Sequence, residues 1–221
     1  MAKQVKSGIS TGELNDIAED LIQQAGAEPS FKNYEGYPAS LCVSVNDHVV
    51  HGIPSRDKII QSGDIVGLDL GIWYQGLCTD TAITIGVDHI NKVAKKLIKV
   101  TRKSLELGIK QAKPGRTLGD IGATIQNYVE KNGFSVVKQL AGHGVGRQVH
   151  EDPRVLNFGQ SGRGEILKPG MVIAIEPMVN VGGYQVETLD DQWTVATKDG
   201  SWSAHFEHTI AITERGNQIL T

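Results

Sequence analysis

VKSGISTGEL at residues 5–14 recurs in altered form as AKPGRTLGDI at residues 112–121. The two stretches align at an offset of 107 residues, with a lysine, two glycines and an acid at matching positions. The same offset places 59–65 (IIQSGDI) on 166–172 (ILKPGMV), and it places Asp69 on Glu176. Two separated matches at one offset indicate an internal duplication. We therefore expect a single domain, residues 1–221, built from two related halves at about 5–88 and 108–221.

Each half is expected to begin with an α-helix. Ser10 and Glu13 have the spacing of a capping box, and Thr117 and Asp120 repeat that spacing ahead of a second apolar stripe. A further helix is predicted at about 90–111, where apolar residues recur every three or four positions. Its counterpart in the first half would have to lie before residue 5. The first half is therefore expected to lack one helix.

Strands are predicted in both halves, at about 40–46, 64–72, 78–86, 171–178 and 205–213. The turn at 74–76 is expected to join the second and third of these strands as a hairpin. The matching hairpin of the second half is longer by 20 residues, which we expect to form an added loop. A helix followed by strands in each half predicts an α+β fold, with helices backing a mostly antiparallel sheet.

The composition is that of a soluble globular protein. The formal net charge is −3, which lacks the basic excess typical of nucleic-acid-binding domains. No apolar run approaches the roughly 18 residues needed to span a bilayer, and no apolar signal segment follows Met1. Only two cysteines are present, so no disulfide framework is expected. These features predict a cytoplasmic protein with no nucleic-acid or membrane partner.

Four carboxylates occupy strand positions related by the duplication: Asp69 and Asp80 in the first half, and Glu176 and Glu207 in the second. Because side chains alternate along a strand, each acid shares a face with mostly small residues, while bulky residues lie opposite. A single acid on a strand usually faces solvent. Four related acids that converge repel one another unless they share protons or hold cations. A pair of divalent metal ions would resolve this conflict.

Histidines add to this pattern. A glycine-rich stretch, Gly142–Pro153, contains His143 and His150, and His51 precedes a proline at the same spacing as His150 does. Glycines allow close approach of the backbone and leave His143 little apolar packing. The residues alone leave open which of His51, His143 and His150 bind metal. A structural role is expected for the remaining histidines, His48, His89, His205 and His208, and His208 is expected to point away from the cavity.

These motifs resemble the type I methionine aminopeptidases, whose fold is often called the pita-bread fold. The resemblance runs from about residue 5 to the C-terminus, through the stretches at 37–46, 51–54, 63–69, 80–81, 142–153, 175–178, 193–195 and 207–209. The Gly-His-Gly and His-Glu pairs are shared with prolidase-like relatives. The Tyr-Pro, His-Gly-Ile-Pro and Trp-Thr-Val stretches favour the methionine enzymes. The resemblance implies an α+β pita-bread fold with two pseudo-twofold related halves.

The resemblance also implies a dinuclear metal site. Its ligands would be Asp69, Asp80, His143, Glu176 and Glu207, with Asp80 and Glu207 bridging both ions. Hard carboxylates with one imidazole suit divalent cobalt, manganese, iron or zinc. A hydroxide bridging the two ions would attack the first peptide bond. Glu176 would shuttle the proton to the leaving amine, His150 would stabilise the oxyanion, and His51 would assist near the attacked bond.

The implied substrate is the N-terminus of a nascent polypeptide. Tyr34, Tyr37, Cys42 and Trp193 would surround the first side chain, and such a soft apolar slot suits a flexible thioether. The second substrate residue is expected to be small. An enzyme that acts on nascent chains is also compatible with transient ribosome association.

Three departures from the family pattern affect these expectations. Phe31 stands where relatives often have a small pocket cysteine, and Val149 stands where they often have a bulky aromatic residue. Both are expected to alter the shape of the pocket. The N-terminal helix of many relatives is absent from the sequence, so we expect either self-association over that surface or lower stability.

Two other functions remain open from the sequence. The first is an Xaa-Pro dipeptidase built on the same scaffold, which would usually carry an additional N-terminal domain. The second is an inactive module that binds chain termini. Such modules generally lose ligand residues, whereas all five are present here.

Overall fold

The largest sheet in the computed structural model, which describes residues 1–221, has nine strands, and seven of them follow the order β1-β4-β5-β14-β9-β7-β8. The other two pair at its sides, β2 with β4 and β15 with β14. The bounds are β1 (Glu28–Pro29), β2 (Cys42–Val45), β4 (Ile65–Tyr74), β5 (Leu77–Gly86), β7 (Gly142–Gly144), β8 (Glu151–Val155), β9 (Val172–Ile175), β14 (Glu207–Thr213) and β15 (Gly216–Ile219). Every pair is antiparallel, as predicted.

Two small sheets and the helices complete the fold. The order of one small sheet is β13-β10-β6, with β6 (Ser135–Val136), β10 (Met178–Asn180) and β13 (Ser203–His205). The other is β11-β12-β3, with β3 (His48–Val50), β11 (Val186–Thr188) and β12 (Val195–Thr197). The helices are α1 (Thr11–Gln24), α2 (Lys92–Gln111) and α3 (Leu118–Lys131), with short 3₁₀ turns at Ala2–Gln4 and Tyr34–Gly36. Together these elements form the α+β pita-bread architecture expected from the sequence.

The duplication is visible in the backbone hydrogen bonds. An isolated antiparallel bridge joins Ser10 to Ile59, and another joins Thr117 to Ile166, 107 residues later on both sides. The amide of Gly8 donates to Ile60 at 2.9 Å, and its counterpart Gly115 donates to Leu167 at 3.0 Å. The chain therefore makes the same local contacts twice, which supports the duplication inferred from the sequence.

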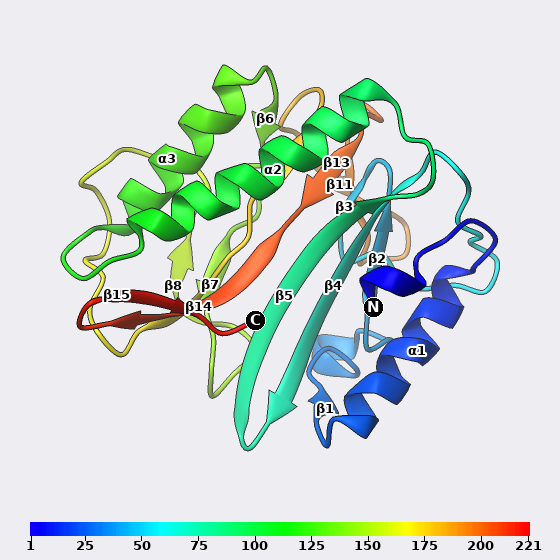
Figure 1. Ribbon diagram of the computed structural model, residues 1–221, viewed down its shortest axis with the longest axis horizontal. Helices are drawn as coiled ribbons and strands as arrows, with labels where there is room; N and C mark the ends of the chain where they lie inside the picture. The colour runs from blue at the N-terminus through cyan, green and yellow to red at the C-terminus, as the bar shows by residue number, and fades with distance from the viewer.

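Both capping boxes form as predicted. The Ser10 hydroxyl accepts from the Glu13 amide ahead of α1, and the Thr117 hydroxyl accepts from the Asp120 amide ahead of α3. In Figure 1, α2 and α3 lie together over the second half, and α1 lies beside β4 at the other end. The first half thus has one long helix where the second has two. None of the helices is long and apolar enough to cross a bilayer.

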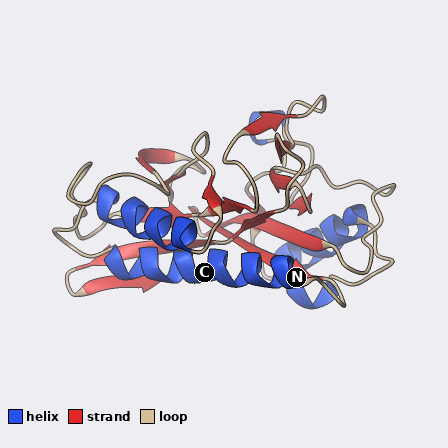
Figure 2. Cartoon of the chain, turned by 90° about the horizontal axis from the view of Figure 1, so that it is seen from above, coloured by secondary structure: helices blue, strands red, loops and turns tan.

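The helices cover one side of the long strands, and the opposite side carries loops and short strands (Figure 2). Each half has its own apolar core. One cluster packs α1 against β2 and β4, and a larger one packs α2 and α3 against β9 and β14. Burial of apolar area is the main force that holds helices on a sheet. The helix side of the sheet is therefore filled, and the other side is available for a site.

Two of the predicted strands are interrupted in the structure. The expected strand at 171–178 divides into β9 and β10 around Glu176 and Pro177, and the one at 205–213 divides into β13 and β14 at Phe206. Proline lacks the N–H that a ladder requires, which explains the first break. At both points the chain passes between the large sheet and the β13-β10-β6 sheet. The two glutamates lie at these crossings rather than in the middle of a strand.

The predicted added loop of the second half contains strands of its own. β11 and β12 pair with each other, and β12 also pairs with β3 of the first half. This pairing carries Trp193, two residues before the start of β12, across to the first half. The insertion therefore helps to build a pocket wall from two distant parts of the chain.

Candidate metal centre

Three of the candidate ligands lie on one face of neighbouring strands. Cys42, Asp69, Ala82 and Glu207 are paired in register across β2, β4, β5 and β14, and Asp80 lies two residues from Ala82 on β5. Residues paired directly across strands share a face. The small side chain of Ala82 leaves room between the carboxylates of Asp69 and Glu207. The sheet register therefore gathers the three acids.

The β4–β5 hairpin keeps this register. Its two turn residues, Gln75 and Gly76, both have positive φ, at 50° and 80°. Such turns match the twist of antiparallel strands, and glycine adopts positive φ without steric cost. The predicted hairpin is confirmed, and it sets Asp69 and Asp80 on adjacent strands.

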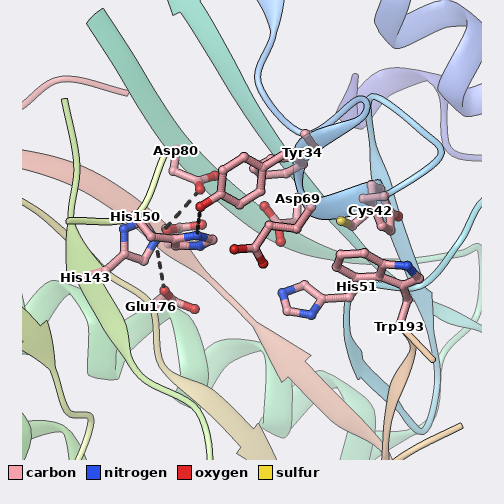
Figure 3. Close-up of a pocket in the computed structure, with 13 residues that line it drawn as sticks. Tyr34, Cys42, His51, Asp69, Asp80, His143, His150, Glu176 and Trp193 are labelled. Carbon is pink, nitrogen blue, oxygen red and sulfur yellow. Dashed lines mark hydrogen bonds and ion pairs between the residues drawn. The ribbon is translucent and has the colours of Figure 1, made fainter. Parts of the chain in front are cut away.

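His143 and Glu176 approach from the second half. His143 Nε2 lies 3.6 Å from Glu176 Oε1 and 3.9 Å from Asp80 Oδ2; Figure 3 shows both contacts as dashed lines. His143 Nδ1 lies 2.8 Å from the Gly144 carbonyl oxygen. A carbonyl only accepts, so Nδ1 carries the proton and Nε2 keeps a lone pair directed at the acids. This arrangement is typical of a metal-ligating histidine.

Burial raises the pKa values of the four carboxyl groups. It raises the pKa of Asp80 to about 7, with repulsion from Glu176 adding to the shift, and it raises the pKa of Glu176 to about 7. Burial and neighbouring acids hold the pKa values of Asp69 and Glu207 well above their usual range. Four acids thus compete for protons in one buried cluster, which is the conflict that bound cations relieve.

The donor set fits divalent metal ions. Ligand atoms of Asp80, His143 and Glu207 lie within 4.8 Å of one another. Asp69 Oδ1 and Glu207 Oε1 are buried and have no hydrogen-bond partner. Such orphaned oxygens are costly unless something binds them. Carboxylate oxygens with one imidazole nitrogen suit manganese, iron, cobalt or zinc in the divalent state.

One cavity is lined by all of the predicted ligands and all of the predicted catalytic and substrate-binding residues. Its lining consists of Phe31, Tyr34, Glu35, Tyr37, Cys42, His51, Asp69, Asp80, His143, His150, Glu176, Trp193 and Glu207. Figure 3 shows the acids between the histidine pair on one side and the Trp193 end on the other. The fold therefore brings together residues from distant parts of the sequence around the acid cluster.

His51 and His150, which flank the acid cluster, differ in their surroundings. The rings of His143 and His150 lie 4.4 Å apart, and His150 Nδ1 lies 3.1 Å from the Tyr34 hydroxyl. His51 adopts a φ of 58°, and burial lowers its pKa to about 4. Burial also lowers the pKa of His150. Both imidazoles are therefore neutral at physiological pH and can donate or accept a hydrogen bond.

The apolar end of the cavity is rigid. The rings of Tyr37 and Trp193 meet edge to face at 5.1 Å, and the Tyr37 hydroxyl donates to the Gly52 carbonyl at 3.0 Å. Cys42 is buried beside them, and burial raises the pKa of its thiol. Its sulfur is therefore a neutral wall atom. Phe31 lines this cavity as expected, whereas Val149 does not.

Val149 instead packs in a buried cluster with Cys78, Val145 and Ala174. Phe31 and Tyr34, which line the cavity, pack against this cluster. Val149 therefore lies behind the cavity wall, and its effect on the shape of the pocket stays a prediction.

A match to metallopeptidase family M24 spans residues 1–214. The methionine aminopeptidase of Clostridium perfringens is 53% identical over the whole chain and 88% of its own length. The chain belongs to the methionine aminopeptidases of this family. Methionine aminopeptidase 1 of Bacillus subtilis is 52% identical, again over the whole chain and 89% of its own length.

Solved structures of family members agree with this. The crystal structure of methionine aminopeptidase from Thermotoga maritima matches with a TM-score of 0.98 and 46% identity, over all of this chain and 88% of that one. Prolidase from Pyrococcus furiosus matches with a TM-score of 0.78 and 26% identity, and this chain covers 57% of it. The fold is shared across the family, and the higher identity lies with the methionine enzymes.

Sequence reasoning missed one residue beside the acid cluster. His205 was assigned a structural role, yet its Nε2 lies 3.6 Å from Glu176 Oε2. A signal was present, because His205 lies two residues before Glu207 and the two were expected to share a face. Most histidines have structural roles, and that general expectation received more weight than the position of His205 on the same face as Glu207. His208, by contrast, bonds Thr221 outside the cavity, as expected.

Proposed function

We propose that the protein removes the N-terminal methionine from nascent polypeptides whose second residue is small, in the cytoplasm, with two bound divalent metal ions. The observation that carries this proposal is the direct adjacency of a buried acid cluster and an apolar slot in one cavity. An exopeptidase for a thioether side chain needs both features, one to cut the bond and one to select the residue. The likeness to methionine aminopeptidases supports the same activity.

The five residues that would hold the ions are Asp69, Asp80, His143, Glu176 and Glu207. Their buried, mutually repelling carboxylates and the lone pair of His143 Nε2 support this assignment. When bound, such ions polarise a carbonyl and lower the pKa of a coordinated water from 15.7 to about 7. The remaining steps fall to side chains of this chain.

Glu176 would move the proton. Its carboxylate would accept a proton from the attacking water and return it to the leaving amine. It lines the cavity beside His143 and the other acids.

The histidines would hold the substrate. His150 would donate to the scissile carbonyl and stabilise the developing oxyanion, and the Tyr34 hydroxyl at its Nδ1 would keep its ring oriented. His51 would orient the attacked bond from the opposite wall (Figure 3). Neutral imidazoles suit these roles, because a charged ring would repel a metal-loaded site.

Tyr34, Tyr37, Cys42 and Trp193 would surround the methionine side chain. An apolar slot discriminates one methylene by only about 1–3 kcal/mol, so some cleavage of N-terminal norleucine or leucine is expected. Phe31 adds bulk to the same cavity and favours small residues in the second position. Transient contact with ribosomes and self-association stay predictions.

One experiment tests the function and separates it from dipeptidase activity. The purified protein is analysed for metal, then assayed with manganese or cobalt on Met-Ala-Ser, norleucine-Ala-Ser, Met-Lys-Ser and an Xaa-Pro dipeptide. We expect rapid release of methionine from Met-Ala-Ser and slow or no cleavage of Met-Lys-Ser. Cleavage confined to the Xaa-Pro dipeptide would assign the prolidase reaction instead. Metal binding without any cleavage would favour a module that only binds chain termini.

A further inference from the structure

Glu176 lies between two imidazole rings, and only one of them belongs to the proposed ligand set. His143 Nε2 lies 3.6 Å from Oε1 of the carboxylate, and His205 Nε2 lies 3.6 Å from Oε2. Each oxygen therefore faces its own ring. Figure 3 shows the His143 side of this arrangement. The His205 side has no role in the reaction described above.

His205 is a buried residue whose ring nitrogen Nε2 lacks a hydrogen-bond partner. The residue is 4% exposed, and its Nε2 is buried without a hydrogen-bond partner. It does not line the cavity, so neither substrate nor solvent reaches it there. A buried polar nitrogen without a partner costs about 1–3 kcal/mol. Glu176 Oε2 is an acceptor that faces this nitrogen, a few tenths of an ångström beyond hydrogen-bond distance.

The backbone of His205 is clamped to the strand that carries Asp80. The Thr84 hydroxyl accepts from the His205 amide at 2.9 Å and donates to the His205 carbonyl at 2.8 Å. Thr84 lies on β5, on the same face as Asp80. The ring is thus held from β5 and β13 while it faces Glu176, which sits at the break between β9 and β10. A residue at a strand break lacks regular ladder support and benefits from a fixed partner.

We propose that His205 is a positioning residue for Glu176. A shift of a few tenths of an ångström would let its Nε2–H donate to Oε2, which leaves Oε1 on the His143 side as the oxygen offered to the metal centre. The inference rests on the proposed function, because it assigns Glu176 to that centre. Carboxylate ligands are commonly oriented by an outer hydrogen bond, and loss of such a partner typically lowers metal affinity by about 10–100-fold. Fixing one oxygen also keeps the other available for proton transfer.

The test compares two substitutions that differ only in the hydrogen bond. His205→Leu fills the space without a donor, and His205→Gln retains an amide donor of similar reach. His208→Leu, on the neighbouring residue that bonds Thr221 outside the cavity, is the matched control. Manganese binding to the metal-free proteins is measured by calorimetry, with the number of ions at saturation and the melting temperature of each metal-free variant.

We expect His205→Leu to lower manganese affinity by about 10–100-fold with the same number of ions bound at saturation. His205→Gln should recover most of that affinity, and His208→Leu should match the parent protein. An unchanged affinity in His205→Leu would overturn the proposal. So would the loss of one bound ion at saturation, since that result would make His205 a ligand itself. Failure of His205→Gln to recover affinity would show that only ring packing matters.

A double-mutant cycle keeps the proposal testable if His205→Leu folds poorly. In the parent background, His205→Asn, whose shorter side chain does not carry its amide to Oε2, should lower manganese affinity. In a Glu176→Gln background the same substitution should no longer change it, because the group on which His205 acts has been altered. Equal effects in both backgrounds would overturn the proposal. Failure of the parent protein to bind manganese would contradict the proposed metal centre, whereas normal binding that His205 variants leave unchanged would contradict only this inference.

Discussion

At the scale of single residues, hydrogen bonds from neutral hydroxyl groups fix the positions of residues in the proposed site. Thr209 Oγ1 accepts from the Asp80 amide and donates to the Asp80 carbonyl, both at 2.8 Å, much as Thr84 does for His205. The Tyr34 hydroxyl makes a single hydrogen bond, with Nδ1 of the His150 ring. Asp80 is thus held through its backbone by a neutral partner that leaves its carboxylate available for cations.

Substitutions of the three proposed catalytic side chains should separate activity from folding. We expect Glu176→Gln to lower kcat by about 10²–10⁴-fold, because it removes the proton acceptor. His150→Ala should lower it by about 10²–10³-fold through loss of oxyanion stabilisation, and His51→Ala should also lower it strongly. Melting temperatures should stay near that of the parent. Glu187→Gln, an exposed acid on β11, is the control; full activity in the first three variants would refute these roles.

The raised carboxyl pKa values also predict a pH effect. Asp80 and Glu176 titrate near pH 7 in the folded, metal-free state, so folding is favoured while they hold protons. That contribution is fully present below their unfolded-state pKa and is lost as pH rises through 7. The buried histidines have lowered pKa values. They change the stability of the fold only below about pH 6.5, where the imidazoles of the unfolded chain take up protons. Stability should therefore fall between pH 6.5 and 8.

Calorimetry of EDTA-treated protein at pH 6.5 and 8.0 would measure this effect. We expect a drop of several degrees, since each kcal/mol lowers Tm by about 2–4 °C in a chain of this size. Glu176→Gln, which does not ionise, should show a smaller drop, and Glu187→Gln should follow the parent. A melting temperature that rises over this interval would contradict the assigned acidities.

At the scale of secondary-structure elements, the repeated glycines mark places where a loop backbone presses on a helix. Gly12 in α1 and Gly119 in α3 are duplicate positions. A Cβ atom at Gly119 would lie 2.2 Å from the Gln160 carbonyl oxygen, and one at Gly12 would lie 3.0 Å from the Arg56 amide nitrogen. The motif recurs because a loop packs over the start of the helix that follows each capping box, α1 in the first half and α3 in the second.

Alanine substitution at these two positions should therefore destabilise the protein. Helix propensity alone would favour alanine by about 1 kcal/mol, but overpacking against backbone typically costs about 1–3 kcal/mol. We expect Gly119→Ala to reduce the free energy of unfolding clearly, and Gly12→Ala to reduce it less, in proportion to the two contact distances. Urea unfolding of the metal-free proteins gives both values. A stabilised Gly119→Ala would mean that the loop moves aside without cost.

At the scale of the whole molecule, the candidate ligands come from both halves of the duplication. Asp69 and Asp80 lie on the first hairpin, while His143, Glu176 and Glu207 belong to the second half. Bound metal would thus link the two halves across the β5–β14 junction, where only Ala82–Glu207 and Thr81–His208 pair directly. A ligand that binds only the folded state stabilises it by mass action.

We accordingly expect manganese to raise the melting temperature of the metal-free protein, and EDTA to reverse the rise. At a metal concentration about 100 times the dissociation constant, the gain should be about 2.7 kcal/mol. Asp80→Asn removes one of the proposed ligand carboxylates and should abolish most of this gain. Glu187→Gln should retain it. An equal gain in Asp80→Asn would place the metal elsewhere.

Much of the fold could be predicted from local patterns. The capping boxes, the apolar stripes and the turn at 74–76 act within a few residues, so spacing alone indicated α1, α3 and the β4–β5 hairpin. The acids could be grouped because alternation places side chains on faces and the duplication relates the two halves. The assignment of Phe31 to the pocket also came from the sequence, through the family resemblance.

Tertiary structure alone decided which side chains meet. The breaks at Pro177 and Phe206 arise because the chain passes between two sheets, and this crossing turns the His205 ring toward Glu176. Val149, between β7 and β8, packs behind the cavity wall with Cys78 of a strand far away in the sequence. Local spacing determines periodicity, which depends on neighbouring residues. Contact depends on the register and packing of strands far apart in sequence, and those are settled by the energy of the whole core.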